Sequence, residues 1–232
     1  MNNKTILIVS DLHAPYCHKD TVAFLKAIKK KYKPTRVILS GDEADFAGIS
    51  FHDHDPDLDA PGKELDKAIK ALQPIYKLFP KAEVLESNHG SLVLRKALAH
   101  GLSRQYFKSP GEILKAPKGW TWHFELTVKL PDGSNCYFHH SKGKPLKTGQ
   151  LYGMSHVCGH LHESFDIQYW STPERLSFAM TVGCLVDKKS LAMAYSKNNQ
   201  KRPIIGVGLI IDSHPVLVPM RMDGRGRWIG SL

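Results

Sequence analysis

The chain has few cysteines and no long apolar run. Its four cysteines, at positions 17, 136, 158 and 184, are scattered along 232 residues, and none of them forms a C-x-x-C pair. This spacing excludes a zinc ribbon or a thioredoxin-type motif and predicts free thiols in a reducing compartment. No stretch resembles a signal peptide, and none is long and apolar enough for a transmembrane helix. We therefore expect a cytoplasmic protein without a membrane partner.

Acidic residues are also scarce relative to basic ones. The 32 lysines and arginines exceed the 22 aspartates and glutamates, which gives a formal net charge of +10. Such an excess favours an anionic partner, with DNA or RNA as the first candidate and a basic surface kept for solubility as the alternative. An apolar share of 42% is enough for a core. Because no repeat or long linker interrupts the chain, we expect residues 1–232 to form a single domain.

The first part of the chain alternates apolar runs with amphipathic patterns. The runs predict buried strands, and the three- and four-residue periods predict helices. This order is typical of parallel strands joined by crossover helices. In chain order, the expected elements are a strand over residues 5–10, a helix over 22–32, a strand over 37–39, a helix over 65–79, a strand over 82–86 and a helix over 91–100.

Three residues mark the expected limits of these helices. Asp20 can cap the N-terminus of the first one. Pro74 lies inside the second one and should kink or split it. Gly101 is expected as the C′ residue after the third.

From residue 120 the pattern changes to short β-strands. Apolar and polar residues alternate from Trp120 to Lys129, and Pro131-Asp132-Gly133 predicts a turn into a returning strand over 136–138. Trp120, Trp122 and Tyr137 are spaced as strand residues that pack in the core. Helix-rich and strand-rich halves together predict an α/β/β/α sandwich of four layers, in which two mixed sheets face each other. The other expected strands cover residues 155–158, 166–170, 177–182, 204–211 and 216–220.

Residue types that commonly bind metals in proteins follow five of these expected strands. Asp42 follows the strand over 37–39 after Ser40-Gly41, and ligands of α/β sheets bind at the carboxyl ends of strands. A buried carboxylate there requires a cation or hydrogen bonds. Each pair alone is ordinary turn sequence, but five pairs in series indicate a metal site, and their mixed donors suit Mn²⁺, Fe or Zn²⁺ better than Mg²⁺. The pairs are Asp11 and His13, Asp42 and Asp45, Asn88 and His89, His139 and His140, and His160 and His162.

In this order the motifs resemble those of the calcineurin-like metallophosphoesterases. They read Asp-Leu-His, Gly-Asp-Glu-Ala-Asp, Ser-Asn-His-Gly, His-His and Gly-His-Leu-His, and they span residues 11–162. That superfamily includes phosphoprotein phosphatases, cyclic-nucleotide phosphodiesterases and DNA-repair nucleases. The resemblance implies the metallophosphoesterase fold and hydrolysis of phosphoesters by a hydroxide that bridges two metal ions. The last third is similar in character to phage-encoded members, for which the compartment is the host cytoplasm.

The resemblance also implies a role for each matching position. Manganese is the first expectation for both metals, with iron, zinc, nickel or magnesium as alternatives. Of the neighbours His139 and His140, the second is favoured because a small residue, Ser141, follows it. The implied ligands are Asp11, His13 and His162 for one metal, Asn88, His160 and one of His139 or His140 for the other, and Asp42 as the bridge, with His89 as a catalytic residue that binds no metal.

Two positions depart from the family pattern. Ser87 stands where glycine is usual, a change that we expect to be harmless. Gly90 stands where glutamate or aspartate is frequent, so another group must orient His89.

The substrate is harder to predict. The place of Asp45 is usually histidine in the repair nucleases and aspartate in phosphomonoesterases. The basic residues Arg95, Lys142 and Lys144 follow the motifs and favour a polyanion, so all four are candidate substrate-binding residues. We expect a phosphodiesterase or nuclease acting on nucleic acid or nucleotide derivatives, with a phosphatase acting on nucleotides or phosphoproteins as the alternative.

Two further alternatives concern the acidic loop and the class of protein. His52 and His54 either line the pocket or lie on a solvated loop. A non-enzymatic scaffold that had lost its metals should lack several of the ligands, and here each one is present.

Overall fold

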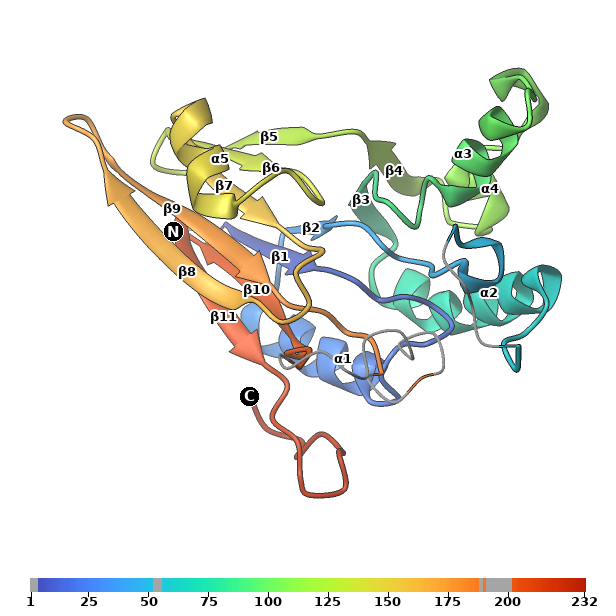
Figure 1. The fold of residues 1–232 in the computed structure, drawn as a ribbon. Coiled ribbons are helices and arrows are strands. Elements are labelled where there is room, and N and C mark those ends of the chain that lie inside the picture. Colours follow the sequence, from blue (N-terminus) through green and yellow to red (C-terminus); the bar gives the residue numbers. More distant parts are fainter. Residues whose placement is uncertain (1–3, 52–55, 188–189, 191–201) are drawn as a thin grey trace.

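Two β-sheets face each other at the centre of the molecule, and helices cover their outer sides (Figure 1). The structure, a computed structural model, describes residues 4–51, 56–187, 190 and 202–232. The arrangement confirms the expected four-layer sandwich of two mixed sheets. No helix in the described residues combines the length and apolar character that a membrane span needs.

The first sheet contains the strands predicted from the apolar runs. Its order is β11-β10-β1-β2-β3-β4; the neighbours from β1 to β4 are parallel, and β10 runs antiparallel to β1 and β11. Helices α1 (Thr21–Tyr32) and α2 (Pro61–Leu78) connect β1 to β2 and β2 to β3, as the crossover pattern predicts. The strands are β1 (Thr5–Val9), β2 (Arg36–Leu39), β3 (Lys81–Leu85), β4 (Gly119–His123), β10 (Gly206–Ile211) and β11 (His214–Pro219).

The second sheet has the order β5-β6-β7-β9-β8 and is parallel only from β6 through β9. Helix α5 (Pro145–Tyr152), on its outer side, was not predicted because the helix is short and contains Gly149. A Cβ at Gly149 would lie 2.5 Å from the Trp170 ring, so the glycine allows the helix to pack closely. The strands are β5 (Leu126–Lys129), β6 (Asn135–Phe138), β7 (Ser155–Cys158), β8 (Phe165–Ser171) and β9 (Leu176–Val182).

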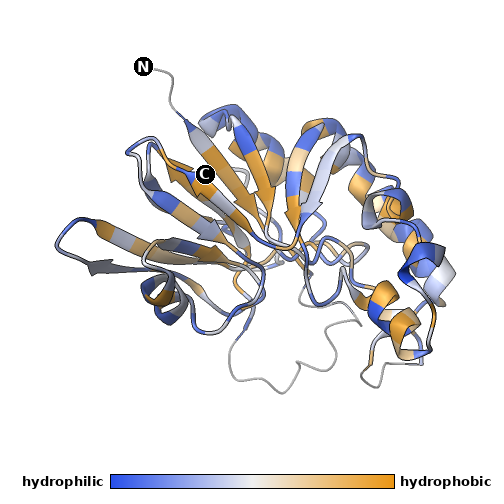
Figure 2. Ribbon diagram, turned by 90° about the horizontal axis from the view of Figure 1, so that it is seen from above, coloured by the Kyte–Doolittle hydropathy of each residue, from blue (hydrophilic) through white to orange (hydrophobic). Residues whose placement is uncertain are grey.

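Alternate residues of β1 enter two different apolar cores. Ile6 and Ile8 face the second sheet, whereas Leu7 and Val9 pack among residues of α1 and α2. Burial on both faces explains why this strand is continuously apolar, and Figure 2 shows the central strands as the most hydrophobic part of the ribbon. The core between the sheets also contains Ile38, Leu85, Phe138, Val157, Met180 and Val182.

The strand-like run from Trp120 to Lys129 does not form one strand. It is divided at residues 124–125 between β4 of the first sheet and β5 of the second. Apolar and polar residues alternate on both sides of this division because β4 and β5 each bury one face. Trp120 and Tyr137 are buried, as predicted, and Trp122 is half-buried.

The expected helix limits are partly correct. Helix α3 (Leu92–Ala99) ends before Gly101, which has the left-handed φ of 75° expected after a helix. Helix α2, however, continues through Pro74, which lies on its exposed side, where water can solvate the carbonyl that the proline leaves unpaired. Three short helical segments complete the description, namely η1 (Ala47–Ile49), η2 (Arg104–Tyr106) and α4 (Pro110–Ile113).

Asp20 does not cap α1 with its side chain. Its carboxylate instead accepts hydrogen bonds from Arg227 Nε at 2.8 Å, Arg227 Nη2 at 2.6 Å and the Trp228 backbone N–H at 3.0 Å. A bidentate, charge-assisted pair is stronger than a hydrogen bond to a backbone N–H of the helix. The Asp20 carboxylate therefore binds the C-terminal segment and does not cap α1. The pair fastens the C-terminal segment to the start of α1.

This contact predicts a pH-dependent stability. The hydrogen bonds from Arg227 hold the pKa of Asp20 well below its usual range. Because the folded-state pKa is lowered, the stabilisation is complete above the ordinary aspartate pKa of about 4 and is lost as the pH falls below it. We expect the melting temperature of Asp20→Asn to lie below that of the parent at pH 7 and to converge with it on acidification. A difference that persists unchanged at pH 2 would contradict this, and Asp66→Asn, an exposed change on α2, is the control.

Candidate metal centre

The candidate ligands lie just beyond the carboxyl ends of strands from both sheets. Asp11 and His13 follow β1, Asp42 follows β2, and Asn88 and His89 follow β3. The second sheet supplies His140 after β6 and both His160 and His162 after β7. The facing sheets therefore bring together side chains that are up to 151 positions apart.

Several of these residues have an unusual backbone conformation. Asp11, His13, Asp42 and His160 have φ values of 52°, 47°, 50° and 65°, in the left-handed region that non-glycine residues rarely adopt. Backbone strain of this kind persists mainly at functional sites. Gly159 permits the close approach of the two sheets, because a Cβ there would lie 2.7 Å from Asp11 Oδ2.

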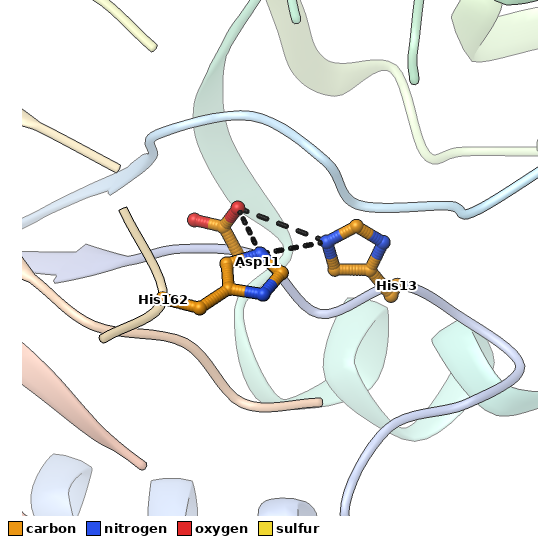
Figure 3. A group of neighbouring side chains, drawn as sticks. All are labelled: Asp11, His13 and His162. Atoms are coloured by element: carbon orange, nitrogen blue, oxygen red, sulfur yellow. Dashed lines mark hydrogen bonds and ion pairs between the residues drawn. The ribbon is translucent and has the colours of Figure 1, made fainter. Parts of the chain in front are cut away.

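Asp11, His13 and His162 form the first group (Figure 3). His162 Nε2 lies 3.0 Å from Asp11 Oδ1 and 3.1 Å from His13 Nε2. His13 Nε2 lies 3.7 Å from the same Asp11 oxygen. The three donor atoms therefore converge on one point.

Asp42, His140 and His160 form the second group. Asp42 Oδ2 lies 3.2 Å from His140 Nε2 and 3.7 Å from His13 Nε2, so this carboxylate is between the two groups. The amide oxygen Oδ1 of Asn88 is 2.8 Å from His140 Nε2. The Asp42 carboxylate therefore lies within reach of donors from both groups.

Two of the imidazoles are fixed from behind by acceptors. His140 Nδ1 donates to the Ser40 carbonyl at 2.5 Å, and His13 Nδ1 is 2.6 Å from Asp45 Oδ1. A carbonyl oxygen only accepts, so His140 Nδ1 carries a proton and its Nε2 is directed at Asp42. Metal-binding histidines are oriented by the same kind of outer hydrogen bond.

The electrostatics of the centre attract positive charge. Burial alone would raise the pKa of Asp42, but the neighbouring imidazoles, His140 first, lower it below its usual range. Burial likewise opposes the effect of His13 and His162 on Asp11, whose pKa is also lowered. His140 shows the reciprocal effect, because the Asp42 carboxylate outweighs burial and raises its pKa to about 9.

A divalent cation fits this donor set. His13 and His162 direct ring nitrogens at each other across 3.1 Å, and such a pair requires a proton or a metal ion between or beside its lone pairs. Buried carboxylates need compensation by positive charge. Imidazole mixed with carboxylate is the donor set of transition metals and zinc.

His89 lies beside the centre and contacts Asp45. Its Nδ1 is 2.5 Å from the Asp45 carbonyl oxygen and 3.2 Å from Asp45 Oδ1, and its backbone N–H donates to Asp42 Oδ1 at 3.1 Å. Asp45 is thus the group that orients His89 in the absence of a carboxylate at Gly90. The side chain of Asp45, a candidate substrate-binding residue, is buried, and its carboxylate contacts both His13 and His89.

Of the two adjacent histidines, the structure brings only His140 to the centre. The His139 ring packs against Phe124 and Tyr137 instead. Lys142 lies with it, because its amine is 3.0 Å from the Tyr137 hydroxyl and is not directed at the ligands. Lys144 is exposed at the start of α5.

The remaining predicted residues have different outcomes. Arg95 reaches the centre, since its Nη2 donates to the backbone carbonyl of Asn88 at 2.6 Å. His52 and His54 lie outside the described residues.

Two residues that support the centre were not predicted from the sequence. The Ser87 hydroxyl accepts the backbone N–H of Asp42 at 2.9 Å and of Gly90 at 3.0 Å, so it ties together the loops that carry Asp42 and His89. Glu43 is buried beneath the same turn, where Trp122 Nε1 donates to it at 3.0 Å and where burial raises its pKa. The serine at a usual glycine position was the signal for the first; none pointed to Glu43.

The contacts of Ser87 predict that its replacement is not harmless. Ser87→Ala leaves two backbone donors without an acceptor, which should cost about 1–3 kcal/mol of unfolding free energy. It should also weaken Mn²⁺ binding, because the Asp42 loop loses its attachment. Chemical denaturation of the metal-free protein and calorimetric Mn²⁺ titration measure the two effects. Ser171→Ala, which removes an exposed hydroxyl on β8, is the control, and equal behaviour of the two variants would contradict the prediction.

Comparison with known proteins gives structural neighbours only. No protein family and no curated protein matches the sequence. A protein of Streptococcus pneumoniae described as a predicted phosphoesterase aligns over 95% of this chain and 90% of its own, with 14% identity and a TM-score of 0.39. The phosphoesterase Yfce from E. coli aligns over 94% and 100%, with 12% identity and a TM-score of 0.43. Vps29 from Entamoeba histolytica, complexed with zinc, aligns over 93% and 97%, with 11% identity and a TM-score of 0.41.

Proposed function

We propose that this chain is a metal-dependent phosphoester hydrolase that cleaves phosphodiesters in nucleic acid or nucleotide derivatives. The observation that carries the proposal is the position of Asp42 between two groups of metal-type donors, with His89 beside them. A carboxylate that contacts donors of both groups can serve two metal ions at once, as a two-metal site requires.

The chain's residues would hold two divalent ions, manganese first among the candidates. When bound, such ions neutralise charge on the phosphoryl oxygens and lower the pKa of a coordinated water. The residues that would hold them are Asp11, His13 and His162 for one ion, Asn88, His140 and His160 for the other, and Asp42 for both.

His89 is placed to supply a proton to the leaving oxygen. Asp45 contacts its Nδ1 through both a carbonyl and a carboxylate oxygen, and this pairing fixes the orientation of the ring, as a general acid requires. The half-buried side chain keeps 20% of its surface exposed, so a substrate can approach it.

The charge of the chain favours a diester within a polyanion. The net charge of +10 and the exposed Arg95 beside Asn88 support binding of a phosphate chain. A phosphomonoesterase is the second candidate. It is favoured by the residue type of Asp45, whose carboxylate in this structure contacts His13 and His89.

Paired substrates test the proposal. Protein stripped with EDTA and reloaded with Mn²⁺ should bind about two ions and hydrolyse bis(p-nitrophenyl) phosphate faster than p-nitrophenyl phosphate, whereas the stripped protein should hydrolyse neither. Metal content is measured by mass spectrometry, and rates by release of p-nitrophenolate. A faster monoester reaction would indicate a phosphatase. Failure to bind Mn²⁺ together with the absence of both activities would indicate a non-enzymatic scaffold.

A further inference from the structure

Two cationic side chains of α3, close in sequence to the candidate ligand Asn88, contact one aromatic ring. Lys96 Nζ lies 4.1 Å from the centroid of the Phe51 ring, and Arg95 Cζ lies 5.3 Å from it. Phe51 follows η1 and keeps 52% of its surface exposed. Attraction between a cation and a ring face fixes the position of the charge without neutralising it.

Arg95 links the Phe51 ring to the candidate metal centre. Its Nη2 donates to the Asn88 carbonyl at 2.6 Å and its Nε donates to Ser91 Oγ at 3.1 Å. The side chain of the same Asn88 lies 2.8 Å from His140 Nε2. The guanidinium therefore contacts the backbone of one candidate ligand directly.

Neither cation forms an ion pair with a carboxylate of the described residues, in contrast to other lysines of the chain. Lys63 contacts Asp59, and Lys142 contacts Glu125. Arg95 and Lys96 instead each hold a positive charge against the same exposed ring. Preorganised adjacent cations of this kind, one of them a planar guanidinium, are suited to a phosphate group.

We infer that Arg95 and Lys96, held against Phe51, bind a second phosphate of the substrate, next to the one that is cleaved. This inference rests on the proposed function and narrows it to a substrate with successive phosphates. The substrate to which we commit is a single nucleic-acid strand, because a chain with a net charge of +10 is matched by an extended polyanion.

A comparison of two short substrates tests the inference. TpT contains one phosphate, whereas TpTpT contains a second one beside the bond that is cleaved. The Mn²⁺-loaded parent should show a higher kcat/KM per bond for TpTpT, and Lys96→Gln should reduce this preference by about fivefold to tenfold. Phe51→Leu should give a smaller loss, because Lys96 then keeps its charge but loses the ring that positions it.

A binding measurement without metal gives a readout that does not depend on catalysis. Fluorescence anisotropy of labelled dT8 with EDTA-treated protein should show that Lys96→Gln flattens the slope of log affinity against log salt by about 0.7. Lys30→Gln is the matched control. It removes the same charge from the last turn of α1 and should leave both the preference and the slope at the parent values.

The outcomes separate the two proposals. Equal behaviour of the Lys96 and Lys30 variants in both measurements would overturn the second-phosphate site. A nucleoside triphosphate that inhibits hydrolysis of TpT with the same dependence on Lys96 would overturn the assignment to nucleic acid. A parent that hydrolyses no phosphoester would refute the proposed hydrolase, while the anisotropy measurement would still decide whether the anion site exists.

Discussion

Asp42→Asn is expected to lower kcat for bis(p-nitrophenyl) phosphate by several orders of magnitude, roughly 10³-fold or more, since both metal ions of a two-metal site depend on the bridging ligand. The Asp42 carboxylate lies between His13 and His140, at 3.7 Å and 3.2 Å. An amide of the same size keeps one oxygen but loses the negative charge and the second ligand oxygen. The expected readouts are a loss of rate and a fall in bound Mn²⁺ below two ions per chain.

The size of the change makes a structural control necessary. Asp42 also accepts the His89 N–H, so circular dichroism and the melting temperature of the metal-free variant must show that the fold is kept. Asp66→Asn removes a carboxylate from the exposed side of α2 and should retain parent activity. Full metal content and full rate in Asp42→Asn would refute the bridging role.

His89→Ala should give the second largest effect, a loss in kcat of roughly 10²–10⁴-fold with both metal ions retained. The structure makes this a real test, because His13, Asp42 and His89 also lie close enough together to hold an ion. We expect His89 to remain unliganded, as the resemblance of its motif implies, with its Nδ1 held by Asp45 and its Nε2 left for the substrate. Loss of one Mn²⁺ from the variant would instead make His89 a ligand.

The leaving group distinguishes an acid from a merely structural histidine. Nitrophenolate leaves without a proton, whereas the alcohol of a nucleotide needs one. His89→Ala should therefore slow cleavage of TpT much more than cleavage of bis(p-nitrophenyl) phosphate. An equal loss on both substrates would indicate that His89 serves only to position the substrate or the Asp42 loop.

The sequence alone determined most of the strands, their order along the chain and the residue types of the centre. Buried strands such as β1 and β2 are readable because burial on both faces demands a continuous apolar run. Asp11 and Asp42 come shortly after such runs. Their place at the carboxyl ends of the strands could therefore be predicted from local sequence. Helix α5 and the division between β4 and β5 were not readable, because each depends on which sheet an element joins.

The tertiary structure separated chemically equal neighbours between which the resemblance gave only a preference. His139 and His140 are indistinguishable by type, and the pairing of β6 within its sheet determines which one turns toward Asp42. Asp45 and Ser87 support the centre through partners 32 and 45 positions away, and a local pattern carries no information about such contacts. The apolar runs predict the layers of the sandwich because burial is a property of each strand by itself. The role of each polar side chain at the centre depends instead on which strand ends the two folded sheets bring together.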